Sequence, residues 1–207
     1  MKALLKHIVA HAEFHAAWLN SLSFMENTGA RKISAAESSR DVTLMVLKHA
    51  AEEARHAYYL KRQILKTGIP GFETYSSEAL LAPVESYTYL NGLDIAISRY
   101  LKTNLSLEDS QLRFAAYLLV TYAIEVRADL LYPVYQEALT EAASLVNVKS
   151  IIAEEEGHLE EMIGQLKEFS PVWKVHAEYA CAVEQKLFDR WIKGLAKHTG
   201  FMEQPVL

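Results

Sequence analysis

The sequence predicts an all-α protein, and two observations support this prediction. Glycine and proline are scarce, with 8 and 5 residues among 207, so few positions interrupt a helix. Apolar residues recur at steps of three and four along almost the whole chain, whereas strand-like alternation is rare. The length and an apolar fraction of 51% suit one domain with a sizeable core, which we assign to residues 1–207.

The first predicted helix covers residues 2–37. Glu26 lies inside its apolar stripe, and Gly29 follows closely. Glycine is a weak helix former, so a break at Gly29 is an alternative. The other members of the stripe are Leu4, Leu5, Ile8, Ala12, His15, Leu19, Leu22, Ala30 and Ile33.

A second helix is predicted from Val42 to about Lys66. Residues 38–41 are polar and supply turn and N-cap side chains before it, and Gly68 and Pro70 follow it. One acid and two histidines lie on its apolar face, which consists of Val46, His49, Ala50, Glu53, His56, Ala57, Leu60 and Ile64.

Residues 70–104 form a long, aromatic-rich connection with a helical stretch from about Val84 to Leu101. Neighbouring helices need a much shorter turn. The length suits a crossover that carries the chain back along a bundle, so that the next helix runs parallel to the second.

The third core helix is predicted to start at an N-cap sequence near Ser106 and to end at about Ala138. Pro133 predicts a kink just past Glu125, because proline removes the amide that would bond the Asp129 carbonyl. The inner face is predicted to carry Leu118, Thr121, Tyr122, Glu125, Asp129 and Tyr132.

Thr140 is the predicted cap of a fourth helix that ends near residue 168. Its inner stripe is Val148, Ile151, Ile152, Glu155, His158, Leu159 and Met162. Ser170 and Pro171 then predict the start of a fifth helix, which runs to about Lys197 before Gly200. Its predicted inward residues are Val172, Val175, Tyr179, Leu187, Trp191 and Leu195.

Charge and cysteine content exclude several classes of function. The net charge of −5 comes without any block of Lys and Arg, so we expect no nucleic-acid partner and no membrane partner. No stretch approaches the roughly 20 apolar residues of a membrane span, and Lys6 and His7 break the N-terminal apolar run of a signal peptide. With Cys181 as the single cysteine, we expect a soluble cytoplasmic protein.

Two segments, residues 51–56 and 153–158, share the pattern Ala-Glu-Glu-x-x-His. A Glu and a His three residues apart lie on one helix face, so each segment can present a carboxylate and an imidazole to one point. One such pair is expected by chance in a chain with this many Glu and His. The interpretation therefore depends on the core position of both segments and on the acid upstream of each.

Glu26 lies 27 residues before Glu53, and Glu125 lies 30 residues before Glu155. In antiparallel helices, residues that are equally far from the connecting turn lie level with each other. Turns at residues 38–41 and near residues 139–140 place both upstream acids opposite their Glu-x-x-His partners. Glu13 is the alternative acid of the first helix, although it lies on the opposite face.

The charges of such a set suit a pair of divalent metal ions. Four carboxylates carry −4 and two divalent cations carry +4, whereas four buried carboxylates without metal would be very costly unless protonated. Oxygen-rich sites with two imidazoles suit iron or manganese better than structural zinc.

The motifs Glu26, Glu53-x-x-His56, Glu125 and Glu155-x-x-His158 resemble the ligand set of the ferritin-like di-iron carboxylate superfamily. The resemblance covers about residues 5–168. It implies a ferritin-like four-helix bundle with a long helical crossover and an additional C-terminal helix. It also implies two iron ions, with manganese as the alternative.

In that resemblance Glu53 and Glu155 bridge or chelate the metals, His56 and His158 each bind one, and Glu26 and Glu125 are terminal ligands. It implies that Glu52 and Glu154 hydrogen-bond the ligand imidazoles, although solvated surface glutamates fit the sequence equally well. Asp129 is a further candidate for such support. We interpret four other residues as packing residues rather than ligands or redox groups: His15, His49, Tyr58 and Tyr122.

The implied function is a non-haem di-iron oxidoreductase: an oxidase, oxygenase or hydroxylase that activates dioxygen and oxidises a small organic substrate. The aromatic-rich crossover and the fifth helix favour a covered pocket. A ferroxidase or an iron-storage or peroxide-detoxifying ferritin-like protein is the alternative, and a metal-free helical scaffold is a third. The sequence identifies neither substrate nor electron donor, and it is compatible with a homodimer.

Overall fold

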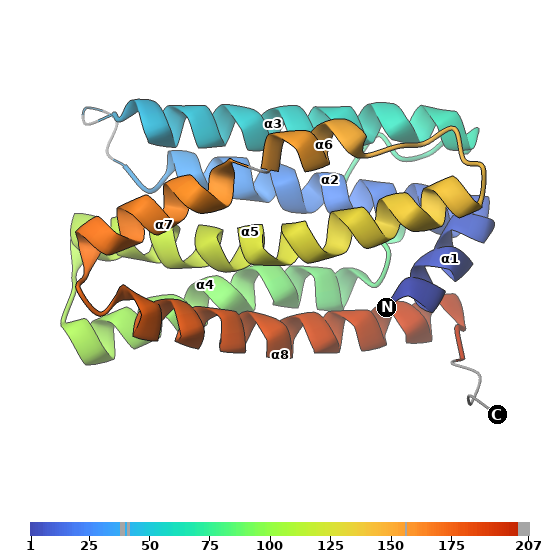
Figure 1. Ribbon diagram of the computed structural model, residues 1–207. Coiled ribbons are helices and arrows are strands. Elements are labelled where there is room, and N and C mark those ends of the chain that lie inside the picture. The colour runs from blue at the N-terminus through green and yellow to red at the C-terminus, as the bar shows by residue number, and fades with distance from the viewer. Residues whose placement is uncertain (38–39, 41, 156, 203–207) are drawn as a thin grey trace.

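The computed structural model describes residues 1–37, 40, 42–155 and 157–202, and all regular structure within them is helical (Figure 1). The all-α prediction is confirmed. Two short 3-10 helices, Leu65–Thr67 and Ser77–Ala79, lie between α3 and α4. The α-helices are α1 (Lys2–Ala10), α2 (Ala12–Ser34), α3 (Leu44–Ile64), α4 (Pro83–Leu105), α5 (Asp109–Glu141), α6 (Lys149–Glu155), α7 (His158–Phe169) and α8 (Trp173–Thr199).

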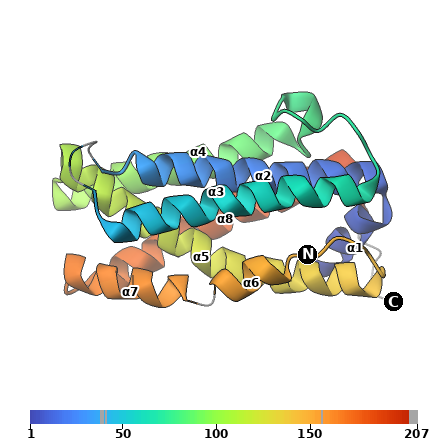
Figure 2. The ribbon, with the colours of Figure 1, turned by 90° about the horizontal axis from the view of Figure 1, so that it is seen from above.

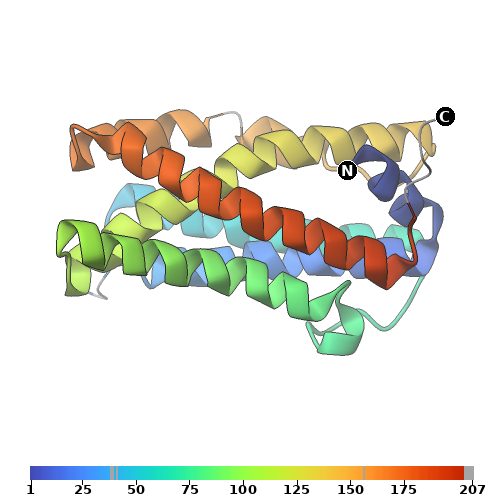
Figure 3. The same cartoon turned by 90° about the horizontal axis from the view of Figure 1, so that it is seen from below.

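Four helical rods form a bundle: α2, α3, α5 and the consecutive pair α6 and α7 (Figures 1 and 2). α2 is antiparallel to α3, and α5 is antiparallel to α6 and α7. α4 returns along the bundle, so that α5 runs in the same direction as α3, in agreement with the predicted crossover. α8 packs against α4 and α5 on the side away from α3, as the view from below shows (Figure 3).

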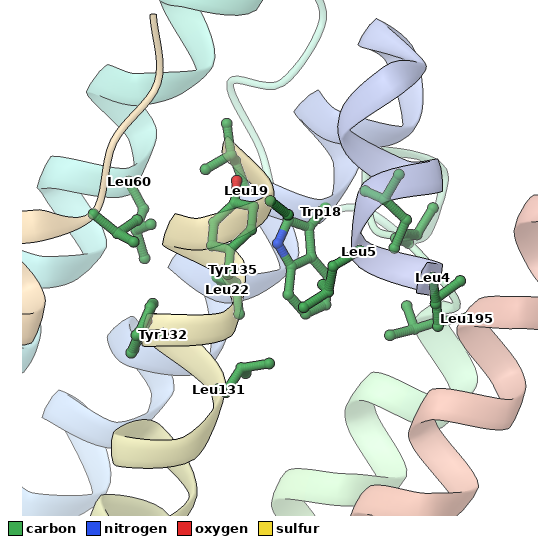
Figure 4. Close-up of a cluster of buried hydrophobic side chains, with 14 of the residues drawn as sticks. Leu4, Leu5, Trp18, Leu19, Leu22, Leu60, Leu131, Tyr132, Tyr135 and Leu195 are labelled. Atoms are coloured by element: carbon green, nitrogen blue, oxygen red, sulfur yellow. The ribbon is translucent and has the colours of Figure 1, made fainter. Parts of the chain in front are cut away.

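The first predicted helix is in fact two helices. His11 has extended backbone angles, φ −117° and ψ 106°, and separates α1 from α2. The alternative of a break at Gly29 is wrong, because α2 continues through this residue. The turn at His11 lets α1 fold across the end of the bundle, where Leu4 and Leu5 lie near Trp18 (Figure 4). Ile8 of α1 is buried in the same cluster. The break lies at His11 because a turn there allows the apolar side chains of α1 to be buried. Helix propensity alone does not predict this tertiary contact.

The boundaries of the second predicted helix are close to those of α3. The Thr43 hydroxyl accepts the Val46 N–H as an N-cap, and Gly68 adopts a left-handed conformation, with φ 73°, beyond the end. The predicted inner face is buried, apart from Ala50 and Glu53, which are half-buried. Residues 38, 39 and 41 of the predicted cap segment lie outside the described residues.

The connection to the fourth rod comes later than predicted. Thr140 lies inside α5, which ends at Glu141, and α6 begins only at Lys149. The Thr140 hydroxyl donates to the carbonyl oxygen four residues earlier, so it does not cap a new helix. The loop buries Val146 and Val148 in the core, and this burial accounts for the extra residues. α5 itself continues as one α-helix through Pro133.

α8 begins at Trp173, after a turn in which the Ser170 hydroxyl accepts the Val172 N–H. The predicted inward positions Val172, Val175 and Tyr179 are wrong, because these side chains are exposed. The prediction failed because the buried face includes polar groups, which a search for apolar residues rejects. This face consists of His176, Ala177, Ala180, Glu184, Phe188, Trp191, Leu195 and Thr199.

A buried ion pair joins the helices behind the bundle. Arg127 on α5 donates from Nε and Nη2 to the two carboxylate oxygens of Glu184 on α8, at 2.9 and 2.7 Å. The Tyr89 hydroxyl on α4 donates to the same carboxylate at 2.7 Å. The guanidinium carbon lies 3.8 Å from the centroid of the Phe188 ring. The pair therefore ties α4, α5 and α8 together.

None of the helices in the described ranges combines the length and the hydrophobicity that crossing a lipid bilayer requires.

We expect Arg127→Met to lower the free energy of unfolding by about 3–5 kcal/mol, because it leaves the buried Glu184 carboxylate without its cation. The double variant Arg127→Met/Glu184→Met should regain most of this loss. Urea denaturation measures both. Lys2→Met, which breaks an exposed pair with Glu137, is the control and should leave the urea midpoint unchanged. A similar midpoint for all four proteins would contradict this role of the pair.

Candidate metal centre

The six predicted ligands converge from the inner faces of the four rods. One group comprises Glu26 on α2 and Glu53 and His56 on α3. The second comprises Glu125 on α5 with Glu155 and His158 from α6 and α7. Within each group, one nitrogen or oxygen atom from each residue lies within 4.8 Å of the others, so each group could hold a metal ion. The two imidazole ring centroids are 6.5 Å apart, which makes the groups neighbours.

The second Glu-x-x-His segment keeps its geometry although the helix is interrupted. Glu155 is the last residue of α6 and His158 the first of α7, whereas the sequence predicts one continuous helix. Gly157 lies between them, and glycine is a weak helix former. The Glu155 Oε2 and His158 Nδ1 atoms are nevertheless 2.9 Å apart.

The outer ring nitrogens pair across the two halves of the bundle. His56 Nε2 lies 2.9 Å from Glu154 Oε2, and His158 Nε2 lies 2.9 Å from Glu52 Oε2. Arg55 Nη2 approaches both acids, at 2.7 Å from Glu154 and 3.8 Å from Glu52. Glu52 and Glu154 therefore contact the imidazoles, which decides against the alternative of solvated surface glutamates. An Nε2–H that donates to a carboxylate leaves Nδ1 as the atom that faces inward.

The inner ring nitrogens face carboxylate oxygens at close range. His56 Nδ1 is buried without a hydrogen-bond partner, and it lies 3.1 Å from Glu155 Oε1 and 3.9 Å from Glu26 Oε2. His158 Nδ1 lies 3.7 Å from Glu125 Oε1. A lone pair on Nδ1 would repel these oxygens, so each imidazole needs either a second proton or a cation between the atoms. The residues thus fit a bound metal ion.

Without metal, protons neutralise the site. Burial lowers the pKa of both imidazoles, but the surrounding carboxylates raise it more, to about 9 for His56 and about 11 for His158. Burial together with repulsion from Glu26 raises the pKa of Glu53 well above its usual range. Burial similarly raises the pKa of Glu125. Hydrogen bonds from the two imidazoles overcome burial and lower the pKa of Glu155.

Two neighbours of the centre were not identified as site residues from the sequence. Tyr132, about two turns beyond Glu125 on the inner face of α5, donates its hydroxyl to Glu26 Oε1. Gly29 on α2 lies beside the carboxylate of Glu53, where a β-carbon would approach Oε2 to 3.4 Å. The signal for Tyr132 was present in the sequence, because it shares a helix face with Glu125.

Two other acidic candidates from the sequence, Glu13 and Asp129, are exposed. Glu13 is exposed in the first turn of α2, about 20 Å of helix away from Glu26. Asp129 is also exposed, so its predicted position on the inner face of α5 is wrong. With 3.6 residues per turn, Asp129 lies about 40° around α5 from Glu125, on a side of the helix that faces solvent.

The two other histidines on the inner faces are packed core residues. His15 Nε2 lies 2.7 Å from the Tyr135 hydroxyl, and burial lowers the pKa of His15 to about 4. His49 lies between the Tyr117 hydroxyl, 2.8 Å from Nδ1, and Glu161, 3.0 Å from Nε2. Both nitrogens of His49 therefore have protein partners.

The predicted packing role of the two tyrosines holds for one of them. Tyr122 is half-buried with its ring edge toward Trp173. Tyr58 is 62% exposed and is not a core residue. Its hydroxyl accepts a hydrogen bond from Arg62 on the surface of α3.

A cavity of about 340 Å³ adjoins the first ligand group, between α2, α4 and α5. Glu26, Glu53 and Tyr132 form one part of its wall, and Trp191 of α8 closes another. Most of the remaining wall is aliphatic and includes Leu22, Met25, Ile33, Leu93, Val120 and Leu131. The candidate ligands Glu26 and Glu53 therefore face a mainly apolar cavity.

Comparisons with protein-family models, with curated proteins and with solved structures give no match to this chain. Any assignment of the site accordingly depends on its residues and their geometry.

Metal binding at pH 7 should release about two protons or more per chain, because both imidazoles are protonated in the metal-free protein and bind metal only when neutral. The affinity should therefore rise with pH between 6 and 8. Titration calorimetry with Mn²⁺ in two buffers of different ionisation enthalpy gives the proton count. His158→Gln should release about one proton fewer. A count near zero would contradict the protonated imidazoles.

Glu53→Gln should abolish metal binding and yet raise the free energy of unfolding of the metal-free protein at pH 7. Because the pKa of Glu53 is raised in the folded state, the wild-type protein becomes less stable as the pH rises above the pKa of this group in the unfolded chain, which is near 4.5. The gain should therefore vanish at pH 4. Thermal unfolding at both pH values measures it, with the exposed Glu13→Gln as control. A variant less stable than wild type at pH 7 would refute the prediction.

Proposed function

We propose that this chain is a ferritin-like dinuclear metal protein that holds two iron ions, or two manganese ions, and uses dioxygen to oxidise an organic substrate. The observation that carries the proposal is the pair of matching Glu, Glu and His groups with inward Nδ1 atoms, joined by Glu155. Oxygen donors outnumber nitrogen donors, and this ratio favours iron or manganese over zinc. The parallel direction of α3 and α5 agrees with the connectivity of ferritin-like bundles.

The residues would divide the work of holding two metals as follows. Glu155 reaches both imidazoles, with Oε1 toward His56 and Oε2 toward His158, and so suits a bridge. Glu53 is influenced by the other three carboxylates, and this central position suits the second bridge. Glu26 and Glu125 each approach one histidine only and suit terminal positions.

Iron in such a site supplies the electrons and the Lewis acidity that dioxygen reduction needs. The chain supplies the surroundings. Glu52 and Glu154 orient the imidazoles and increase their basicity. Tyr132 holds a proton beside the Glu26 carboxylate. The mainly aliphatic cavity wall offers few hydrogen-bond partners to water in the space next to Glu26 and Glu53.

The cavity favours oxidation of an organic substrate over iron storage. An iron-storage site needs a polar route for hydrated ions, whereas the space beside these ligands is lined mostly by aliphatic side chains. A wall of this kind suits an apolar ligand.

The proposal is tested by metal content. After anaerobic loading with Fe²⁺ and desalting, mass spectrometry should find close to two irons per chain, and admission of oxygen should produce new near-ultraviolet absorption. Glu53→Ala/Glu155→Ala should lose both metals and remain helical by circular dichroism. Glu13→Ala is the matched control and should keep two. Two irons retained by the double variant would refute the ligand assignment.

A further inference from the structure

The cavity beside the candidate metal centre follows α2. Its wall on this helix extends from Leu22 to Ile33, which corresponds to about 17 Å of helix. The cavity as a whole is lined mainly by apolar side chains, so an extended apolar group can lie along this helix.

The cavity opens beside α4. Asp94 and Ser98 line both the cavity and an adjoining surface depression, so they mark the mouth. Lys32 Nζ on α2 lies 3.0 Å from Asp94 Oδ2 across this mouth, and both side chains are partly exposed. Arg99 and Lys102 line the depression outside.

The charges at the two ends of this path differ in sign. Around the mouth, Lys32, Arg99 and Lys102 are positive and only Asp94 is negative. Further in, Glu26 and Glu53 form part of the wall. An anionic group is therefore stabilised at the mouth and repelled from the carboxylates, whereas an uncharged chain passes them.

Two independent estimates give the length of that chain. A volume of about 340 Å³ holds about 11 non-hydrogen atoms if each occupies about 30 Å³, as a water molecule does. The path from Lys32 to Leu22 is ten residues of helix, or about 15 Å, and an extended chain advances about 1.3 Å per carbon, which gives about 12 carbons.

We propose that the cavity binds one unbranched fatty carboxylate of about 12 carbons, with its carboxylate at Lys32 and its tail extending past Glu26 toward Leu22. This inference rests on the proposed function, because it names the substrate class of the same site. Glu26 lies about 9 Å of helix beyond Lys32, so the metal centre would be level with about the seventh carbon of the chain.

The test is titration calorimetry of straight-chain carboxylates with 6 to 16 carbons, each below its micelle concentration, against the full chain with and without Mn²⁺. The affinity should rise about fourfold with each added methylene and level off near 12 carbons. Dodecanoate should bind more tightly than dodecanol. Absence of binding, or a rise that continues to 16 carbons, would overturn the proposal.

Two variants locate the ligand. Ala116→Phe fills the cavity from α5 and should weaken dodecanoate binding at least tenfold while the metal content stays at the wild-type value. If Ala116→Phe does not fold, Ala128→Phe is used instead, because Ala128 also lines the cavity. The control Ala182→Phe changes an exposed residue of α8 and should have no effect. Wild-type dodecanoate affinity in a folded cavity variant would overturn the proposal.

The head group is tested separately. Lys32→Gln should reduce the preference for dodecanoate over dodecanol, and the exposed Lys174→Gln should not. An unchanged preference in Lys32→Gln would overturn the assigned orientation. A chain that binds two metals but no carboxylate would refute this inference and leave the proposed function intact. A chain that binds dodecanoate but no metal would support the inference and refute the proposed function.

Discussion

The convergence of four carboxylates and two imidazoles inside a helical bundle is the constraint on which the rest of the structure depends. The inner Nδ1 atoms face carboxylate oxygens at distances that require a proton or a cation between them. The outer Nε2 atoms are fixed by Glu52 and Glu154, each from the other half of the bundle. This cross-pairing holds α3 and the α6–α7 rod at a set distance. It also directs the inner Nδ1 atoms toward the carboxylates of the cluster.

A centre of this kind works against the stability of the metal-free protein, because burial and mutual repulsion disfavour the ionised carboxyls. Contacts in other parts of the bundle offset this loss of stability. α1 folds over one end and buries its leucines, and the Arg127–Glu184 pair fastens α8 to α5. The cavity adjoins the second of these supports, because its wall includes Tyr89 and Arg127. The same buried polar network that orders α8 therefore also shapes the space beside the candidate ligands.

The correct and incorrect sequence predictions have a common cause. Helices such as α3, in which apolar residues alternate with the buried polar ones at steps of three and four, follow the predicted pattern closely. The prediction fails where burial is polar or where a loop joins the core. The buried face of α8 was not recognised because it contains Glu184 and His176. The connection after α5 is longer than predicted because Val146 and Val148 are buried in the core. Nothing in the sequence around His11 indicates that α1 turns across the end of the bundle.

The sequence by itself determined the helical class and the repeated Glu-x-x-His pattern on core faces, because a fixed rise and rotation per residue convert spacing along the chain into position on a helix face. Only the tertiary structure decided that Glu26 rather than Glu13 joins the cluster, that Glu52 and Glu154 support the opposite imidazoles, and that a cavity adjoins the centre. These features are contacts between residues about 100 positions apart, or empty space between helices, and no local pattern encodes the distance between two packed helices.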